Sequence, residues 1–346
     1  MALTDEGRVP ERAYKAMQAN ELGLGFGIAL AERVVKSWYP DHVVSVVDAG
    51  VALMAGWSLG GSEPSKGSRS RPDFAIEAWK PGEPSKIVLV ASKGNHQLPS
   101  KRARRTLRTA TRQLARSSEQ AEGLHVGPWN TTPCLLVSTE LAGQGGIVVN
   151  ALQAPGIGQL DLPRNALPRS FDSEAEDHNW PYLGQVPRPR RDAHRNEGTD
   201  GFQISEDRAA WFAQVVARTG AAGLAAFVGG GRTTAQYLTK RQGRRFYDVP
   251  TFAGSSSIHD ADITVGDTKF VGTDHVFRLN TVRVVAFSGI AEPLYPLLAQ
   301  GRVEEYRRQA YALRSYWQRL GSSADWDGPI SFREDGTVMA LRILNT

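Results

Sequence analysis

Two residues in the first hundred positions have the types and the spacing that phosphodiester chemistry requires. Asp73 follows a proline at the start of one apolar run, and Lys93 ends the next apolar run. If these runs are adjacent antiparallel strands, the two side chains lie side by side. A carboxylate there can bind a divalent cation, and a lysine beside it can orient a water molecule and stabilise the charge that develops on phosphorus. Hydrolysis of a phosphodiester would also need a second acid.

Asp73, Lys93 and the order of the elements around them resemble the PD-(D/E)xK nuclease superfamily. The resemblance covers roughly residues 11–152 and implies a restriction-endonuclease-like α/β fold. In that family the aspartate and an acid two residues before the lysine bind Mg²⁺. Carried over to this chain, Asp73 is the metal ligand and Lys93 the catalytic lysine. The position of the second acid holds Ala91, which cannot bind a metal ion.

Four other side chains are candidates for the missing ligand. Glu77 lies at an even offset from Asp73 and would share its strand face, so we predict Glu77 as the second catalytic and metal-binding acid. Glu21 and Glu32 lie on the first predicted helix, and His96 follows the second strand. The alternative is structural: Glu77 is then an exposed strand residue, and His96 is a solvated loop residue.

A second signal is the basic segment that follows Lys93. Residues 101–118 contain seven basic side chains and no acid. On a helix, five of these side chains lie opposite a narrow apolar stripe. They are Lys101, Arg105, Arg108, Arg112 and Arg116. Like charges at this spacing repel, so the pattern favours a polyanion partner such as DNA. A solvated basic face is the alternative.

The apolar periodicity predicts the elements that position these residues. The expected order is helix, three strands, helix, two strands. The segments are a helix over 11–39, a short apolar stretch Val51–Trp57, a hairpin of Pro72–Trp79 and Lys86–Ser92, a helix over Lys101–Gln120, and strands at Cys134–Leu141 and Ile147–Leu152. The fold class is therefore α/β, with a mixed sheet flanked by helices.

The second half of the chain predicts a smaller α+β domain of unknown role. Residues 155–205 are interrupted by prolines and read as a linker or a long ordered insertion. The segments beyond it are a helix over Arg208–Val228, strands near 269–278 and 282–287, a helix over Glu304–Leu320, and a hairpin over Ile330–Ile343. We therefore expect a nuclease-like domain over 1–154 and an α+β domain over 206–346.

Composition limits the classes of protein that remain. The 346 residues include 41 Lys and Arg against 36 Asp and Glu, a net charge of +5. The single cysteine, Cys134, excludes an intramolecular disulfide and a zinc site built on cysteines. The first residues lack the apolar core of a signal peptide. A cytoplasmic protein without a membrane partner is expected.

Together these features predict a DNA-binding, metal-dependent nuclease-like protein of bacterial restriction, phage defence or DNA processing. Its cofactor would be Mg²⁺ or Mn²⁺, and it would act as an endonuclease on DNA. The first alternative is a catalytically inactive nuclease-like subunit that binds DNA or acts as a scaffold in a defence complex with a protein partner. The second is a protein–protein interaction module without nucleic acid.

Overall fold

The computed structural model describes the regular elements of the chain and the turns next to them. The described residues are 12–54, 72–97, 124–126, 133–142, 146–154, 160–161, 182–186, 199–204, 209–239, 242–247, 260–279, 282–323 and 327–344. The predicted DNA-binding residues, Lys101 to Arg116, lie outside them.

The first half of the chain forms a mixed sheet. Its elements are α2 (Arg12–Trp38), β1 (Val43–Asp48), α3 (Ala49–Met54), β2 (Phe74–Trp79), β3 (Lys86–Gln97), β5 (Cys134–Ala142) and β6 (Gly146–Ala154). The strand order is β1-β2-β3-β5-β6, with β7 (Leu160–Asp161) pairing with the start of β3. All neighbours are antiparallel except β3 and β5, which are parallel. Parallel neighbours need a long crossover connection, which here runs through residues 98–132.

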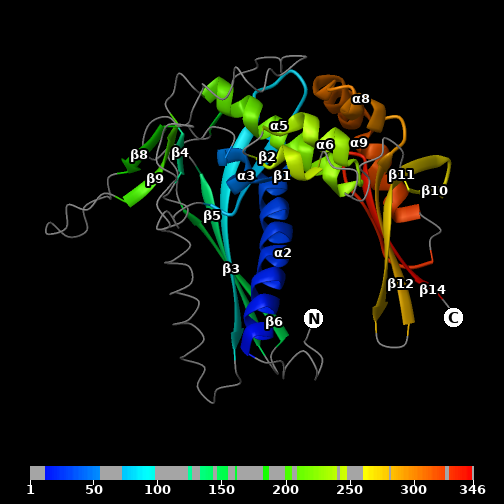
Figure 1. Ribbon diagram of the computed structural model, residues 1–346, viewed down its shortest axis with the longest axis horizontal. Helices are drawn as coiled ribbons and strands as arrows, with labels where there is room; N and C mark the ends of the chain where they lie inside the picture. Colours follow the sequence, from blue (N-terminus) through cyan, green and yellow to red (C-terminus); the bar gives the residue numbers. More distant parts are fainter. Residues whose placement is uncertain are drawn as a thin grey trace, which may run out of the picture.

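Helices cover both faces of this sheet (Figure 1). On β3, Val88 and Val90 pack against α2, whereas Ile87 and Leu89 pack against α5 (Ala209–Phe227). Successive strand residues point to opposite faces, so this alternation sets the register between the sheet and its helices. The boundary predicted at residue 206 had placed α5 in the C-terminal domain, but α5 completes the core of the first sheet.

The C-terminal part is built on a second, antiparallel sheet. Its strand order is β10-β11-β12-β14-β13. The strands are β10 (Ala261–Val265), β11 (Thr268–Leu279), β12 (Val282–Ala291), β13 (Ile330–Phe332) and β14 (Thr337–Leu344). The helices near it are α6 (Gly231–Tyr237), α7 (Arg244–Tyr247), α8 (Tyr295–Ala299) and α9 (Val303–Ser323). The prediction of an α/β protein with a further α+β part is confirmed at this level.

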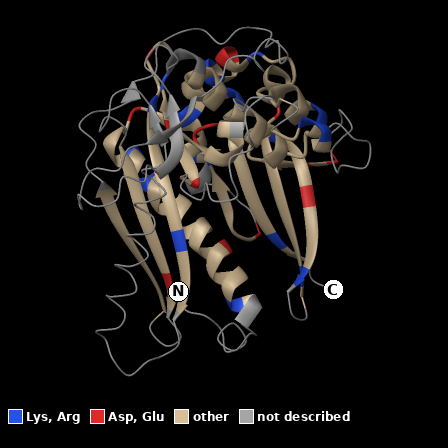
Figure 2. Ribbon diagram, turned by 60° about the vertical axis from the view of Figure 1, so that its left-hand side comes forward, with Lys and Arg blue, Asp and Glu red and all other residues tan. Residues whose placement is uncertain are grey.

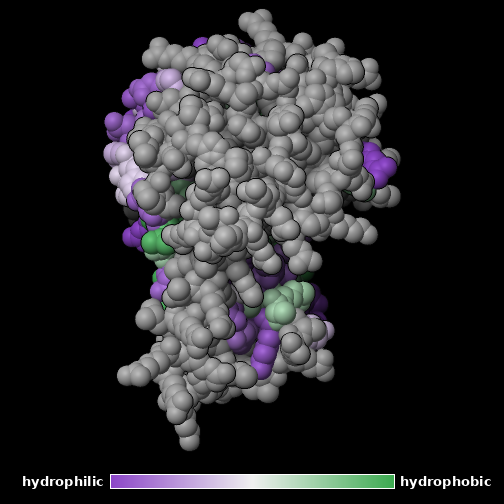
Figure 3. Space-filling model, turned by 90° about the vertical axis from the view of Figure 1, so that its left-hand side faces the viewer, coloured by the Kyte–Doolittle hydropathy of each residue, from purple (hydrophilic) through white to green (hydrophobic). Residues whose placement is uncertain are grey.

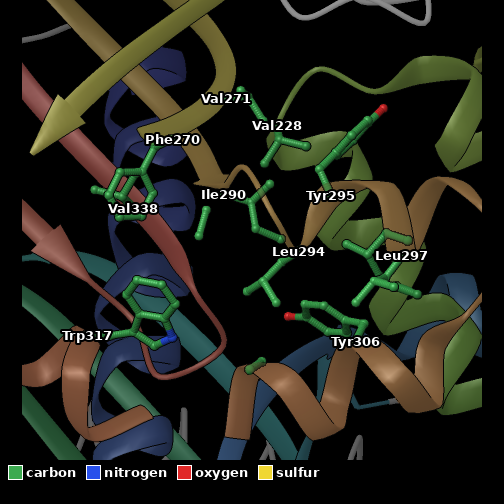
Figure 4. Packing of buried hydrophobic residues seen from close by; sticks show 14 of the residues in the cluster. Val228, Phe270, Val271, Ile290, Leu294, Tyr295, Leu297, Tyr306, Trp317 and Val338 are labelled. Atoms are coloured by element: carbon green, nitrogen blue, oxygen red, sulfur yellow. The ribbon is translucent and has the colours of Figure 1, made fainter. Parts of the chain in front are cut away.

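One apolar cluster joins the two sheets. Phe270, Leu294 and Trp317 lie at the centre of the C-terminal core (Figure 4). Val43 of β1 and Trp79 of β2 belong to the same cluster, although they lie on the first sheet. The two sheets therefore share a core.

Residues 155–205 contribute strands, which favours the ordered-insertion interpretation. The segments β8 (Tyr182–Val186) and β9 (Thr199–Ile204) form a hairpin, and β9 also pairs in parallel with β4 (Leu124–Val126). The strand β1 was not predicted; the apolar stretch expected at Val51–Trp57 begins instead inside the short helix α3.

Candidate functional site at the end of β2

Asp73 lies immediately before β2 and closes the end of the β2–β3 ladder. Its backbone N–H donates to Val90 O at 2.9 Å. Its carboxylate Oδ2 accepts a hydrogen bond from the backbone N–H of Ser92 at 2.7 Å. The Ser92 N–H lies just beyond the last residue paired with β2, so the Asp73 side chain supplies an acceptor where the backbone ladder has ended.

Lys93 converges on the same carboxylate from within β3. The strand continues to Gln97, so the prediction that it ends at Ser92 is wrong. Its Nζ lies 3.9 Å from Asp73 Oδ2. About a third of the Lys93 side chain and a quarter of the Asp73 side chain are exposed, at 32 % and 23 %. The pair can therefore contact a ligand from solvent, and its two charges can hold an anionic group and orient a water molecule.

The helix α2 fixes this part of β3 from the opposite face. Ser92 Oγ donates to Gly23 O at 2.9 Å. A Cβ atom on Gly23 would lie 2.5 Å from Gly94 Cα, so only glycine allows the helix to approach so closely. Gly23 and Gly27 of α2 thus permit close contact with Gly94 and Ser92, the residues on either side of Lys93.

Ala91 lies where the resemblance places the second acid, and its surroundings are apolar. The residue is fully buried and packs with Leu136 and the partly buried Cys134. Alternation along β3 puts Ala91 on the same face as Lys93. The face that would carry two carboxylates therefore carries a methyl group beside Asp73.

Glu77 lies in a different environment from the one predicted for it. Both of its carboxylate oxygens accept hydrogen bonds from Arg307 of α9, at 3.0 and 2.7 Å, and Oε1 also accepts from Ser85 Oγ at 2.7 Å. Glu77 is only 1 % exposed, so its interpretation as an exposed strand residue is wrong. Four residues along a strand amount to about 13 Å, which separates Glu77 from the backbone of Asp73.

The other candidate ligands also have partners of their own or lie on the surface. Glu32 forms an ion pair with Arg333, which precedes β14, and Glu21 is exposed on α2. His96 Nε2 lies 2.8 Å from Gln18 Oε1. His96 belongs to β3 because that strand continues to Gln97, so the prediction of a loop there is wrong.

The positions of Asp73, Ala91 and Glu77 decide whether the site fits a metal ion. Among the residues that the structure describes, no three His, Cys, Asp or Glu side chains gather as a metal-binding group. Asp73 contributes one carboxylate, Ala91 contributes none, and Glu77 is held by Arg307. The described residues therefore do not form the two-carboxylate site that Mg²⁺ or Mn²⁺ would require.

The structure adds an acid that the sequence argument did not consider. Parallel pairing places Ser138 beside Lys93 and Glu140 beside Asn95, so both β5 residues share the Lys93 face. Glu140 is 1 % exposed, and burial raises the pKa of its carboxyl group. Glu140 is thus a diagonal neighbour of Lys93 on the β5 side, whereas Asp73 approaches Lys93 from the β2 side. The available signal was a single acidic residue, Glu140, within the strand Cys134–Ala142.

Figures 2 and 3 show how charged and hydrophilic residues are distributed over the described part of the molecule. Lys and Arg lie on several strands and on the helices above them (Figure 2). In the lower part of the face in Figure 3, hydrophilic residues gather beside a few hydrophobic ones. In the part of the chain that the structure describes, no helix is long and apolar enough to cross a membrane.

Comparison with known proteins gives no relative from which a role could be transferred. A scan against protein-family models and searches of curated proteins and of solved structures found no match to this chain. Function is therefore inferred from the residues and from their geometry.

Proposed function

We propose that this protein is a DNA-binding subunit with a nuclease-like α/β unit whose metal site is incomplete. The observation that carries the proposal is the pairing of Asp73 with Lys93 at 3.9 Å beside a buried Ala91. The first two residues have the types and the juxtaposition of the PD-(D/E)xK site, and the third removes a carboxylate from it.

The arrangement of the elements supports this proposal. A helix, α2, precedes three antiparallel strands, and a long connection then leads to a strand parallel to the third. Asp73, immediately before β2, and Lys93 of β3 lie side by side in this unit. The order of helix and strands in the nuclease superfamily is compatible with this topology.

Charge favours nucleic acid as the partner. Seven basic residues and no acid occur between positions 101 and 118, immediately after the strand that carries Lys93. Arginine binds phosphate through two parallel hydrogen bonds, which makes it suited to a DNA backbone. A DNA-binding subunit of a defence or DNA-processing complex, with a protein partner that supplies catalysis, would use such a segment.

Binding and cleavage assays on the full chain test this function together. Fluorescence anisotropy with labelled duplex and single-stranded DNA should show binding that weakens steeply with salt. Supercoiled plasmid should remain uncut with Mg²⁺ or Mn²⁺ present. Absence of DNA binding at low salt would contradict the proposal.

A metal-dependent nuclease is the second candidate, and the partial exposure of the Asp73–Lys93 pair favours it. This candidate requires a further acid from outside the described residues. It predicts plasmid cleavage that EDTA stops and that Asp73→Asn abolishes with little effect on DNA affinity. Cleavage that survives Asp73→Asn would exclude this site as its origin.

A further inference from the structure

The second sheet extends beyond the helices that cover it. Its free end comprises residues 274–279 of β11, 282–285 of β12 and 341–344 of β14 (Figure 1). Five consecutive residues of β11, 274–278, are exposed, although successive strand residues point to opposite faces. On β11 both faces of the free end are therefore open to solvent, whereas on β12 Val284, on the face opposite Arg283, is buried.

One face of the free end carries three arginines. Arg278 of β11 lies directly opposite Arg283 of β12. Arg342 of β14 lies opposite Val285, two residues along β12 from Arg283, so it belongs to the same face. Directly opposed side chains have Cβ atoms about 5 Å apart, and diagonal neighbours about 7–8 Å. The three guanidinium groups thus form one patch, the arginine face.

The internal energetics of the sheet do not explain this arrangement. Like charges placed directly opposite each other on neighbouring strands destabilise a sheet. Among the described residues, no ion pair involves Arg278, Arg283 or Arg342. Asp274, the acid of β11 on this face, lies four residues from Arg278, about 13 Å along the strand. An anionic partner would remove the repulsion.

The positive charge of the arginine face also determines which class of partner can bind there. A second copy of this chain would place arginine against arginine. A nucleic-acid backbone instead supplies regularly spaced phosphates, which arginine binds bidentately. An exposed apolar side chain on the same face, Val276 at 58 %, lies beside the patch and can pack against sugars and bases.

We propose that the arginine face of the second sheet binds the phosphate backbone of duplex DNA. The inference rests on the proposed DNA-binding function, and adds to Asp73, Lys93 and the basic residues of 101–118 a contact surface on the second sheet. Three phosphate contacts account for about 2.7 units of the slope of log affinity against log salt.

The test compares three variants of the full chain. The triple variant Arg278→Gln, Arg283→Gln, Arg342→Gln removes the patch. The variant with lysine at the same three positions keeps the charge. A control with Arg245→Gln, Arg302→Gln and Arg308→Gln makes the same change in net charge elsewhere. Thermal unfolding verifies that each variant is folded, and anisotropy with a labelled duplex between 50 and 300 mM salt measures affinity and slope.

We expect the first variant to bind at least about tenfold more weakly at 100 mM salt, with a slope lower by about two to three units. The lysine variant and the control should keep a slope close to that of the wild type. If the first variant binds like the wild type, the arginine face is not a DNA contact. If it instead changes the oligomeric state or loses an acidic protein ligand while DNA affinity persists, the face serves a protein. If the wild type binds no duplex at all, the proposed function itself fails.

Discussion

Asp73 combines a structural contact with a chemical one at the level of single residues. Its Oδ2 accepts the Ser92 N–H and is also the oxygen nearest to Lys93 Nζ. The carboxylate is therefore held in place by the backbone before any ligand arrives, as a binding group must be. An aspartate at the start of a strand is therefore weak evidence for catalysis by itself. The backbone N–H of Ser92 needs an acceptor where the β2–β3 ladder ends, and Asp73 supplies it.

The Ala91 position allows a direct test of the incomplete metal site. Ala91→Glu should lower the free energy of unfolding by more than about 3 kcal/mol, because it buries a charge among apolar groups. If the site lacks only this carboxylate, Mg²⁺ or Mn²⁺ should raise the melting temperature of the Glu variant and leave the wild type unchanged. The isosteric Ala91→Gln variant, which cannot ionise, is the control. A metal effect of equal size on all three proteins would mean that the ion binds elsewhere.

Glu140 should make stability depend on pH. Burial raises the pKa of Glu140 in the folded state, so folding favours its protonated form. Ionisation of the buried Glu140 carboxyl group destabilises the folded protein. This loss of stability is absent below the pKa of the unfolded state, grows as pH rises, and is complete above the raised pKa of the folded state. Glu140→Gln should therefore gain stability over the wild type as pH rises from 4 towards neutrality. Urea unfolding at several pH values measures the difference, and a difference that does not change with pH would refute it.

At the level of elements, the contact of α2 with β3 depends on two glycines with contrasting surroundings. A Cβ on Gly23 would lie 2.5 Å from Gly94 Cα, whereas one on Gly25 would meet nothing within 4 Å. Gly23→Ala should destabilise the protein by about 1–3 kcal/mol through overpacking. Gly25→Ala should stabilise it by about 0.5–1 kcal/mol, since alanine is the better helix former. Chemical denaturation of the pair measures both signs, and equal effects would contradict the close packing.

Helices and strands with a clear apolar periodicity were predictable from the sequence, whereas the strands with which they pair were not. The helix α2, the β2–β3 hairpin, α9 and the C-terminal hairpin all follow from apolar spacing and turn residues. The strand β1 was not predicted because its valines face both sides of the sheet, Val44 and Val46 towards α2 and Val47 towards α5, and therefore show no alternation of apolar and polar residues. The parallel pairing of β3 with β5 is a property of the tertiary fold and leaves no local mark in either strand.

In the candidate site, too, local features were predictable from the sequence and contacts with distant residues were not. Proximity of Asp73 and Lys93 follows from hairpin geometry, which is local. The burial of Glu77 depends on Arg307, which lies 230 positions away, and no pattern near Glu77 indicates that partner. Glu140 joins the Lys93 face through the register of the parallel pair, which the sequence does not specify.

At the level of the whole molecule, the Glu77–Arg307 pair holds α9 against the first sheet. The side chains are 1 % and 12 % exposed, and Arg307 also lies over the Trp79 ring at 5.0 Å. Glu77→Gln should cost about 3–5 kcal/mol, because it leaves a largely buried guanidinium without its counter-charge. The double variant Glu77→Leu, Arg307→Met should recover much of that loss. A double-mutant cycle of Glu77→Leu, Arg307→Met and their combination, followed by urea unfolding, measures the coupling free energy between the two residues. If the losses of the two single variants simply add, the residues act independently.

The shared core also governs how the chain can fold during synthesis. The first sheet needs α5 on one face, and Glu32 meets Arg333 from 301 positions later. Val43 and Trp79 likewise belong to a cluster most of whose members come later in the chain, from α5 to β14. A nascent chain that ends after β6 would therefore expose surfaces that the finished protein buries, and it would rely on chaperones or remain aggregation-prone. Because ribosomes deliver these segments in order, the first sheet can complete its packing only after the second sheet has been synthesised.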